Sequence, residues 1–431
     1  MTATAVNQEL LQAMVGSLPA DNLAPARTAA ARKFAATGFP TVRQEDWKYT
    51  DLAIAADISN AWLSKPTAAC DMSFASRGPL FDAVLDSIDA HWVIIRNGII
   101  EPAQLEAIAS AIGADTTLSR IAEEQAPELS TDDPLSAFNI ALLRDGLRIT
   151  AARAAAPDKP IGLLFLDSPS SAVTQTRVII EANAASHLRL VECCLSVAPG
   201  RQFTNSVLET RLSSGARLDH VRIQRRDDAH VGTSRMSARL GRDSTLHHSN
   251  FDFGGALTRN DVAIEIAESG ATVRLDGLYL ASAEQHVDNH TCIVHGVGPS
   301  RSTEEYRGIL AGRSRCVFNG KIIVATGADG TDSVQSNHNL LLSERAEIDT
   351  KPELEIYADD VKCAHGATVG QLDETALFYL RSRGLDNDQA RQVLTRAFAA
   401  GMLDALAVVE CRDHVAIVLD ECLASLIGKN S

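Results

Sequence analysis

Between Leu147 and about Val369 the chain repeats one short pattern, a polar or glycine-containing turn followed by a small residue and then by alternating apolar positions. The successive small residues are 30, 28, 27, 43 and 32 residues apart. Repeats carried by strands rather than helices are typical of a solenoid in which each coil stacks on the one before. We therefore predict a parallel β-helix over residues 147–370. The six occurrences are Ala184-Ala185-Ser186, Ser214-Gly215-Ala216, Arg242-Asp243-Ser244, Ser269-Gly270-Ala271, Gly312-Arg313-Ser314 and Glu344-Arg345-Ala346.

Alternation within the short apolar runs supports strands with one face inside. Leu218, His220 and Arg222 alternate with Val221 and Ile223, which is the period of two expected for a strand. A β-sandwich is the alternative, but it would require tight two-residue hairpins. Convincing Asn-Gly or Asp-Gly hairpin signals are scarce in this range.

The two ends of the chain have a different texture. Residues 1–146 are mixed and largely helical, with amphipathic segments at 8–15, 24–37 and 103–113. His91 to Ile100 reads as a strand that runs into an Asn97-Gly98 turn. Asp133-Pro134 opens a helix over Leu135 to Leu143 that stops at Asp145-Gly146.

A C-terminal helical domain is expected over residues 371–431. Glu374 to Ser382 has a helical pattern and is followed by Gly384. Asp386 and Gln389 then form a capping-box arrangement before a second helix. The apolar positions of that helix are Leu394, Phe398 and Met402.

Charge and composition exclude several kinds of partner. The chain has 40 basic and 55 acidic residues, a net charge of −15, which opposes neutralisation of nucleic-acid phosphates. Arg222, Arg225 and Arg226 precede Asp227 and Asp228 directly, so we expect a solvated charged face there. No window approaches the length of a membrane span and no signal peptide is visible, so we expect a cytoplasmic protein.

The eight cysteines indicate thiols rather than disulfides. They lie far apart, without a C-x-x-C pair, and we expect most of them to be buried in a reducing compartment. Cys193 and Cys194 would point to opposite faces of any strand, which favours core packing for both. The positions are 70, 193, 194, 292, 316, 363, 411 and 422.

Motifs of ordinary catalysis are missing. The sequence contains no G-x-x-x-x-G-K-[ST], no strand-linked G-x-G-x-x-G, no H-E-x-x-H and no G-x-S-x-G. The chain therefore lacks the residues that cradle phosphates, bind dinucleotides, hold a zincin metal or form a nucleophile elbow. An enzyme acting alone is disfavoured.

Cys363 and His365 are the best candidates for chemistry. If Leu354 to His365 is extended, both side chains lie on one face with their Cα atoms about 6.5 Å apart. Thiolate and imidazole suit iron, zinc and sulfur, and two ligands leave positions that a partner chain can fill. The alternative is a buried thiol beside a satisfied histidine.

Two other segments hold residues that could bind a ligand. His286 to His295 contains three histidines, a cysteine and an aspartate, yet we favour a polar loop that closes a coil over a metal site. In a strand, His286, Asp288 and His290 would share one face and His295 would lie on the other. For Trp47-Lys48-Tyr49 a packing anchor is favoured over a ligand platform.

Ser343 to Gly384 closely resembles the C-terminal core of the SufB/SufD family of iron–sulfur cluster assembly proteins. SufB-like chains carry an acidic H-E-A-[ST]-T stretch at the position where this chain has His365-Gly366-Ala367-Thr368. In this respect the chain resembles the SufD branch of the family. Further matching segments are Glu45 to Thr50, Asn289 to His295, Tyr306 to Leu310, Phe318 to Ile322 and Gln335 to Leu342.

The resemblance implies a right-handed parallel β-helix and a non-catalytic scaffold role. It implies a complex with one SufB-like chain and two SufC ATPase subunits, with ATP bound only by SufC, which docks on the tail after Gly370. Sulfur from a cysteine desulfurase system and iron would meet near the interface with the SufB-like chain, where Cys363 and His365 match. A reduced flavin in the complex is also implied.

Two further readings remain open. A carbohydrate-active β-helix enzyme would need exposed aromatic residues and usually a secretion signal, whereas aromatic residues make up only 5% of this chain. A structural homo-oligomer would pair with itself through the edge that otherwise meets the SufB-like chain, and we expect a homodimer when the chain is alone.

Overall fold

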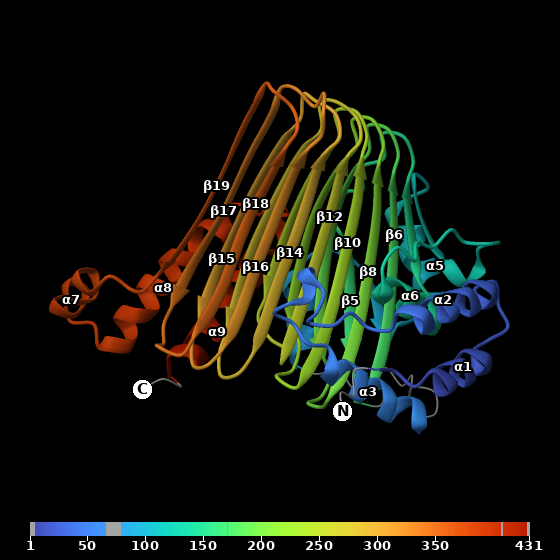
Figure 1. The fold of residues 1–431 in the computed structure, drawn as a ribbon, viewed down its shortest axis with the longest axis horizontal. Helices are drawn as coiled ribbons and strands as arrows, with labels where there is room; N and C mark the ends of the chain where they lie inside the picture. Colours follow the sequence, from blue (N-terminus) through green and yellow to red (C-terminus); the bar gives the residue numbers. More distant parts are fainter. Residues whose placement is uncertain (1–4, 66–78, 170, 407, 429–431) are drawn as a thin grey trace.

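The computed structural model describes residues 5–65, 79–169, 171–406 and 408–428. A long stack of strands forms the centre of the molecule, and helices from the two ends of the chain lie beside it (Figure 1). The helices are α1 (Gln8–Ser17), α2 (Ala24–Thr37), α3 (Ala53–Ser64), α4 (Pro79–Ser87), α5 (Pro102–Ile112), α6 (Pro134–Leu142), α7 (Glu374–Ser382), α8 (Asn387–Asp404) and α9 (Arg412–Gly428), with 3₁₀ turns η1 (Glu45–Trp47), η2 (Ile121–Glu123) and η3 (Val409–Cys411).

Local chemistry starts and stops these helices as predicted. Asp133 caps α6, since its carboxylate accepts hydrogen bonds from the backbone N–H groups of Leu135 and Ser136 at 2.9 and 3.0 Å. The capping box of α8 is also present, with Asp386 and Gln389 bonded reciprocally. The helices predicted at 8–15, 24–37, 103–113 and 374–382 are confirmed as α1, α2, α5 and α7, whereas α3, α4 and α9 go unpredicted.

The strands form two sheets that face each other. Within the described residues, a 10-stranded sheet has the order β19-β17-β15-β13-β11-β9-β7-β5-β1-β2, and a 9-stranded sheet has the order β18-β16-β14-β12-β10-β8-β6-β4-β3. Apart from β2 and β3 the first holds the odd-numbered strands and the second the even-numbered strands, and the two are called the odd-numbered and the even-numbered sheet. The strands are β1 (His91–Arg96), β2 (Ile99–Ile100), β3 (Thr116–Arg120), β4 (Leu147–Ala151), β5 (Ile161–Asp167), β6 (Val173–Ala182), β7 (His187–Ser196), β8 (Gln202–Leu212), β9 (Arg217–Arg225), β10 (His230–Leu240), β11 (Thr245–Asp252), β12 (Leu257–Ile266), β13 (Thr272–Ala281), β14 (His286–His295), β15 (Arg301–Leu310), β16 (Arg315–Val324), β17 (Thr331–Leu341), β18 (Glu347–Ile356) and β19 (Val361–Gly370).

This arrangement is a parallel β-solenoid with two strands in each coil. Neighbours within each sheet pair in parallel throughout, apart from the short antiparallel pairs β1–β2 and β3–β4 at the N-terminal end. Leu218 of β9, for example, lies between Leu188 of β7 and Leu246 of β11. The predicted solenoid is confirmed, and the β-sandwich is excluded because its sheets would be built from antiparallel pairs.

The corner between each even-numbered strand and the next odd-numbered strand explains the repeat. At the corners from β6–β7 to β12–β13 the chain turns through a residue with positive φ, immediately before the small residue. Asp243, with a φ of 54°, donates its backbone N–H to the carbonyl of Ser269 in the neighbouring coil at 3.1 Å. The small residue that follows, Ser244, is fully buried. Equivalent positive-φ residues are Ala185, Gly215 and Gly270.

The interval of 43 residues in the repeat arises because each coil has two corners. Ala271 directly precedes β13, whereas Ser314 and Ala346 directly precede β16 and β18 at the opposite corner. The true successor of Ala271 is Ser300, which lies 29 residues further along, directly precedes β15 and is also buried. The small residues at any one corner recur at a regular interval. The predicted series is irregular because its first four members lie at one corner of the coil and its last two at the other.

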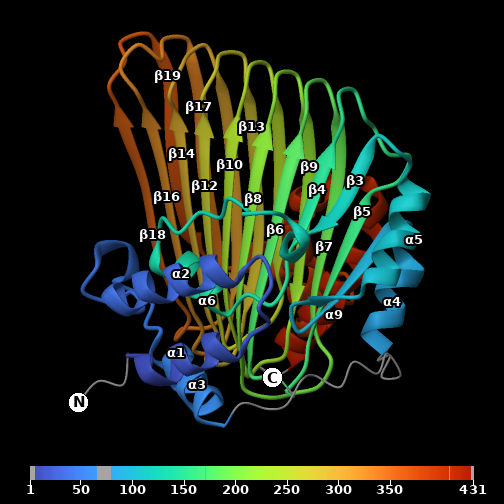
Figure 2. The same cartoon turned by 90° about the vertical axis from the view of Figure 1, so that its right-hand side faces the viewer.

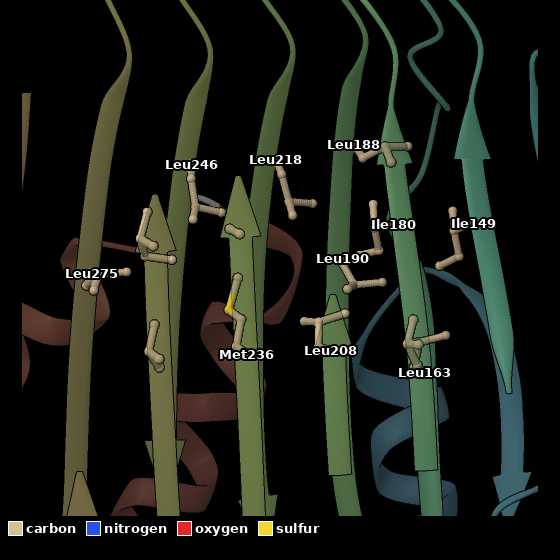
Figure 3. Close-up of a cluster of buried hydrophobic side chains, with 14 of the residues drawn as sticks. Ile149, Leu163, Ile180, Leu188, Leu190, Leu208, Leu218, Met236, Leu246 and Leu275 are labelled. Carbon is tan, nitrogen blue, oxygen red and sulfur yellow. The ribbon is translucent and has the colours of Figure 1, made fainter. Parts of the chain in front are cut away.

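Apolar side chains from both sheets fill the space between them over the N-terminal and middle coils (Figure 3). Ile149, Ile180 and Leu208 from the even-numbered strands meet Leu163, Leu190 and Leu218 from the odd-numbered strands. Burying such side chains stabilises the fold by about 1.5–3 kcal/mol each. The stacked apolar columns therefore fix the register of the coils.

Helices cover the outer face of each sheet (Figure 2). Helices α1, α2, α3 and α6 pack on the even-numbered sheet, where the rings of Phe34 in α2 and Phe138 in α6 lie 4.8 Å apart and Phe203 of β8 lies 6.2 Å from Phe138. On the odd-numbered sheet, Val221 and Ile223 of β9 belong to one apolar cluster with Val415 and Leu419 of α9. Both faces of β9 are therefore buried.

The predicted solvated face at Arg222, Arg225 and Arg226 is wrong. Arg222 and Arg226 are buried, and each is paired with a buried carboxylate, Asp252 at 3.1 Å and Asp167 at 2.6 Å. Arg222 alternates with Val221 and so points between the sheets rather than outward. Of the three arginines only Arg225 reaches the surface, where it pairs with a carboxylate of α9.

The described helices lie within residues 5–65, 79–169, 171–406 and 408–428. None of those helices is long and apolar enough to cross a membrane.

Candidate functional site

The solenoid is open at its C-terminal end. Within the described residues, β18 pairs only with β16 and β19 only with β17, so one edge of each terminal strand has no neighbour (Figure 1). No side chain of β18 or β19 is fully buried. Unpaired strand edges offer N–H and C=O groups that pair readily with another strand. This end is therefore suited to meet a second chain.

Cys363 and His365 both lie on β19 at this open end. The register places Cys363 beside Ser333 and His365 beside Gln335. Ser333 and Gln335 are buried between the two sheets, so the two candidate residues occupy inward-facing positions of the last coil. Because no described coil covers them, His365 is exposed and Cys363 is half-buried. Their chemistry is accessible from the end of the solenoid.

The extended segment predicted from Leu354 to His365, which placed both side chains on one face, is interrupted by a corner. Leu354 to His365 is not a single strand, because β18 ends at Ile356 and β19 begins at Val361. Residues 357–360 form the last corner, where the carbonyl of Asp360 accepts the backbone N–H of Gly330 at 2.7 Å. The candidate pair lies wholly after that corner, so its shared face follows from β19 alone.

The surroundings of Cys363 keep its thiol protonated near neutral pH. The side chain packs with Leu354 and Val361 against the buried residues Ile322 and Val324. Burial raises the pKa of the Cys363 thiol and the nearby carboxylate of Asp332 raises it further, while a backbone hydrogen bond from Ser333 lowers it. A metal or another positive charge would favour the thiolate.

A hydrogen-bonded chain of polar side chains leads inward from the position of Cys363. The hydroxyls of Ser333 and Ser302 lie 2.6 Å apart, and Ser302 contacts Nε2 of His295 at 2.9 Å. Nδ1 of His295 contacts Ser300 at 2.8 Å. Burial lowers the pKa of His295 to about 4, so it stays neutral. This histidine is a satisfied core residue.

A second polar column leads inward from the position of His365. Gln335 donates from Nε2 to Oε2 of Glu304 in the preceding coil at 2.7 Å. Glu304 is fully buried, and burial raises the pKa of its carboxyl to about 7. Sequence reasoning missed both residues. The available signal was the series Gln335, Asn337 and Asn339, which places an amide at every second position of one strand and so predicts an inward polar face.

The segment His286 to His295 is strand β14, so the predicted polar loop is wrong. The alternative arrangement for a strand is confirmed: His290 contacts Asp288 at 3.0 Å on one face, and His295 is buried on the other. Asp288 also pairs with Arg259 and accepts a hydrogen bond from Thr50. The cluster ties the N-terminal segment to the solenoid.

Trp47 and Tyr49 act as packing anchors in this structure. The guanidinium of Arg259 lies 4.3 Å from the ring centroid of Trp47, and that of Arg315 lies 5.5 Å from the ring of Tyr49. Contacts of this kind stabilise by about 0.5–2 kcal/mol. They hold the segment before α3 against the outer face of the even-numbered sheet.

The cysteines are free thiols in the described part of the chain. Cys194 belongs to the core between the sheets and Cys193 to the cluster under α9, which confirms their opposite directions. Cys316 and Cys411 are buried, Cys292 and Cys422 are half-buried, and Cys70 lies outside the described residues. Among the described residues, no three His, Cys, Asp or Glu side chains are close enough together to hold a metal ion.

The C-terminal helices present exposed aromatic residues. Phe378 and Tyr379 of α7 are 73% and 56% exposed, and only Leu377 of that helix is buried. By contrast α8 is fixed to the solenoid, since Arg307 of β15 donates to the carbonyl of Phe398 and Arg391 donates to that of Leu342 at 3.1 Å. Helix α7 therefore extends from a fixed base with an apolar surface uncovered.

Comparison with known proteins agrees with this geometry. Residues 165–398 match the family model described as "SUF system FeS cluster assembly, SufBD core domain". This range includes most of the solenoid, the open end and helix α7.

Individual relatives match over most of the chain. The iron–sulfur cluster assembly protein SufD of Escherichia coli is 29% identical over 86% of this chain and 86% of its own length. An iron–sulfur cluster assembly SufBD family protein of Synechocystis is 28% identical over 94% of this chain and 92% of its own. The chloroplastic protein ABCI7 of Arabidopsis thaliana is 31% identical over 56% of this chain and 51% of its own.

Proposed function

Since the chain belongs to the SufBD core-domain family of the SUF iron–sulfur cluster assembly system, we propose that it is a SufD-like scaffold subunit that receives a nascent cluster at the open end of its solenoid. The observation that carries the proposal is the position of Cys363 and His365 together on β19, inward-facing but uncovered. A thiolate and an imidazole are suitable ligands for iron and for sulfur-bridged clusters. The nascent cluster is the cargo of this site.

Two protein ligands leave coordination positions for a second chain. We place a SufB-like subunit there, joined to the unpaired edges of β18 and β19 by continued strand pairing. Apolar side chains near these edges support this assignment, since Ile356, Tyr357 and Val369 are 41%, 60% and 50% exposed. Cys363 and His365 would then lie at the junction of two solenoids.

When the SufB-like chain is absent, we expect the same edges to pair with a second copy of this chain and give a homodimer. Light scattering with and without the partners separates these states. A chain that stays monomeric alone and does not associate with a SufB-like subunit would contradict the assignment of the edges.

Docking of a SufC-like ATPase is assigned to residues 371–431. Exposed Phe378 and Tyr379 on α7 support this part of the proposal, because exposed aromatic residues commonly anchor interfaces. ATP is bound by that partner, since this sequence lacks the phosphate-cradling motif. The chain also lacks a dinucleotide-binding motif, so none of its residues is assigned to a reduced flavin in the complex.

In this proposal the chain itself is not an enzyme. Its contribution is to hold the cargo in a fixed geometry, with sulfur supplied by a cysteine desulfurase system. A reducing, cytoplasmic compartment suits a site that depends on a free thiol.

The decisive experiment compares cluster formation by complexes carrying His365→Ala or Cys363→Ala. We expect several-fold less iron and sulfide retained with either variant, at unchanged complex assembly. Lys362→Ala is the matched control, because Lys362 immediately precedes Cys363 in sequence but faces the other side of β19. Undiminished cluster formation by both site variants would overturn the proposed site.

A further inference from the structure

The inward-facing column under His365 contains an acceptor that lacks a donor. Gln335 is 1% exposed and directs Nε2 to the carboxylate of Glu304. The amide therefore presents its nitrogen to Glu304 and its oxygen elsewhere. Oε1 of Gln335 has no hydrogen-bond partner among the described residues. A buried acceptor without a donor is costly, at about 1–3 kcal/mol.

The even-numbered sheet supplies no donor side chain to this oxygen. Across the space between the sheets lies Gly320 of β16, and a Cβ on that residue would lie 2.2 Å from Nε2 of Gln335. The absent side chain at Gly320 is therefore what makes room for the amide. The residue beside Gly320 in the last coil is Pro352 of β18, which has no backbone N–H.

His365 is the one side chain in the last coil that carries an N–H donor and stacks directly on Gln335. The two residues are register partners on β19 and β17, so their Cα atoms are about 4.8 Å apart. A neutral imidazole has one nitrogen that donates and one that accepts. A hydrogen bond to Oε1 of Gln335 therefore selects which nitrogen carries the proton.

We infer that Gln335 is a positioning residue for His365: the two side chains are not hydrogen-bonded in the described conformation, but when the exposed imidazole turns inward, the side-chain oxygen of Gln335 accepts one imidazole N–H and leaves the other ring nitrogen free to face the open end. Glu304 acts one step further in, because its hydrogen bond fixes the direction of the Gln335 amide. Histidines that bind metals are commonly oriented in this way by a hydrogen bond on the opposite nitrogen. The role of His365 as a ligand rests on the proposed function, but its orientation does not.

The tautomer of His365 can be measured in the full-length chain without any cluster. Nitrogen-15 labelling of histidine reports which ring nitrogen carries the proton, and the spectrum of His365→Gln assigns the signal. We expect Gln335→Met to change the ratio of the two tautomers at least about fivefold, since one hydrogen bond is lost. Ser333→Ala is the matched control, because it changes an inward residue of the same strand outside this column, and it should leave the ratio within about twofold.

A second variant protects the test against failure to fold. Gly320→Ala keeps the glutamine but displaces its amide, so it should move the tautomer ratio in the same direction as Gln335→Met. A ratio that is unchanged in both folded variants would overturn the inference. Thermal unfolding of each variant shows whether it is folded.

Cluster formation by the assembled complex separates this inference from the proposed function. We expect Gln335→Met to slow cluster formation about tenfold, as for loss of other groups that orient metal ligands. If His365→Ala abolishes cluster formation but Gln335→Met leaves the tautomer ratio unchanged, only the positioning role of Gln335 is overturned. If Gln335→Met changes the tautomer ratio but His365→Ala still forms clusters at the full rate, the proposed cluster site is overturned and the contact between Gln335 and His365 is retained.

Discussion

Tyr279 of β13 lies over Gly308 of β15, its register partner on the neighbouring strand. A Cβ on Gly308 would lie 2.4 Å from Cε2 of the tyrosine ring and 2.5 Å from Oδ1 of Asn339. The hydroxyl of Tyr279 donates to that same Oδ1 at 2.6 Å. Asn339 belongs to β17, so the glycine indirectly supports the strand on which the last coil stacks.

Gly308→Ala is therefore expected to destabilise the protein by about 1–3 kcal/mol, because the added methyl group overpacks a filled space. Chemical denaturation measures the effect as a lower midpoint. Gly366→Ala is the matched control, since no heavy atom lies within 4 Å of a Cβ built there. Equal midpoints for the two variants would contradict the role of Gly308.

The carboxyl of Glu304 predicts a dependence of stability on pH. Its pKa is raised by burial to about 7 in the folded chain from an ordinary value of 4.5. The folded state therefore holds this proton more tightly, so the stabilisation is complete below about pH 4.5 and is lost as the pH rises through 7. We expect Glu304→Gln to gain on the order of 3 kcal/mol relative to the native chain between pH 5 and pH 8.

Denaturation of the two proteins at a series of pH values checks this prediction. Glu305→Gln is the control, because Glu305 faces the opposite side of β15 and pairs there with Arg307 at 2.5 Å. A constant difference in stability between Glu304→Gln and the native chain across that range would show that the carboxyl titrates normally.

Sequence reasoning predicted the solenoid because its two signals, period-two alternation and small residues at corners, are local properties of strands and turns. It misjudged the Arg222 to Arg226 segment and His286 to His295 for one physical reason. Polar residues usually indicate solvent, but the space between these sheets accepts charges that are paired, as Arg222 is with Asp252. Such pairs join residues 30 apart in the chain, so no short window reveals them.

The candidate site was partly predictable in the same sense. Cys363 and His365 are two residues apart in sequence and share a strand, which local alternation captures. Their accessibility depends on β19 being the last strand, and Gln335 and Glu304 come beneath them from coils 30 and 61 residues earlier. That relationship is a property of the stacking register, which the irregular spacing of the repeat concealed.

Asp288 is expected to be the carboxylate on which the attachment of the N-terminal segment depends most. It is fully buried, pairs with Arg259, and accepts a hydrogen bond from Thr50. Although burial raises the pKa of Asp288, Arg259 and His290 hold it well below its ordinary range. Asp288→Ala should cost about 3–5 kcal/mol, since it leaves a buried arginine with one partner fewer.

Denaturant unfolding measures the loss of stability in Asp288→Ala. Unfolding at a series of acidic pH values shows in which direction the contribution of Asp288 to stability changes with pH. Because the folded pKa of Asp288 is lowered, its contribution is present above the ordinary value near 3.8 and is lost as the pH falls through the folded value. Asp261→Ala is the control, as Asp261 pairs with the same arginine but its side chain is 22% exposed. A larger loss of stability in Asp261→Ala than in Asp288→Ala would contradict the prediction that Asp288 is the more important partner of Arg259.

Asp332 is expected to control the reactivity of Cys363. After burial, the carboxylate of Asp332 is the next cause of the raised pKa of this thiol. Asp332→Asn removes that charge, so more thiolate is present at a given pH and alkylation of Cys363 should be about twofold faster near pH 8. Mass spectrometry of iodoacetamide-treated protein measures the rate at this one cysteine.

Salt separates this electrostatic effect from a change in access to the thiol. Asp332 is 42% exposed at its side chain, so about 1 M salt should screen most of the difference between Asp332→Asn and the native chain. Asp349→Asn on β18 is the matched control, because this exposed carboxylate pairs with Arg315 and does not act on Cys363. A difference in alkylation rate that persists in high salt would mean that Asp332→Asn opens the last coil and exposes the thiol. A difference that disappears in high salt shows that the negative charge of Asp332 keeps the Cys363 thiol protonated.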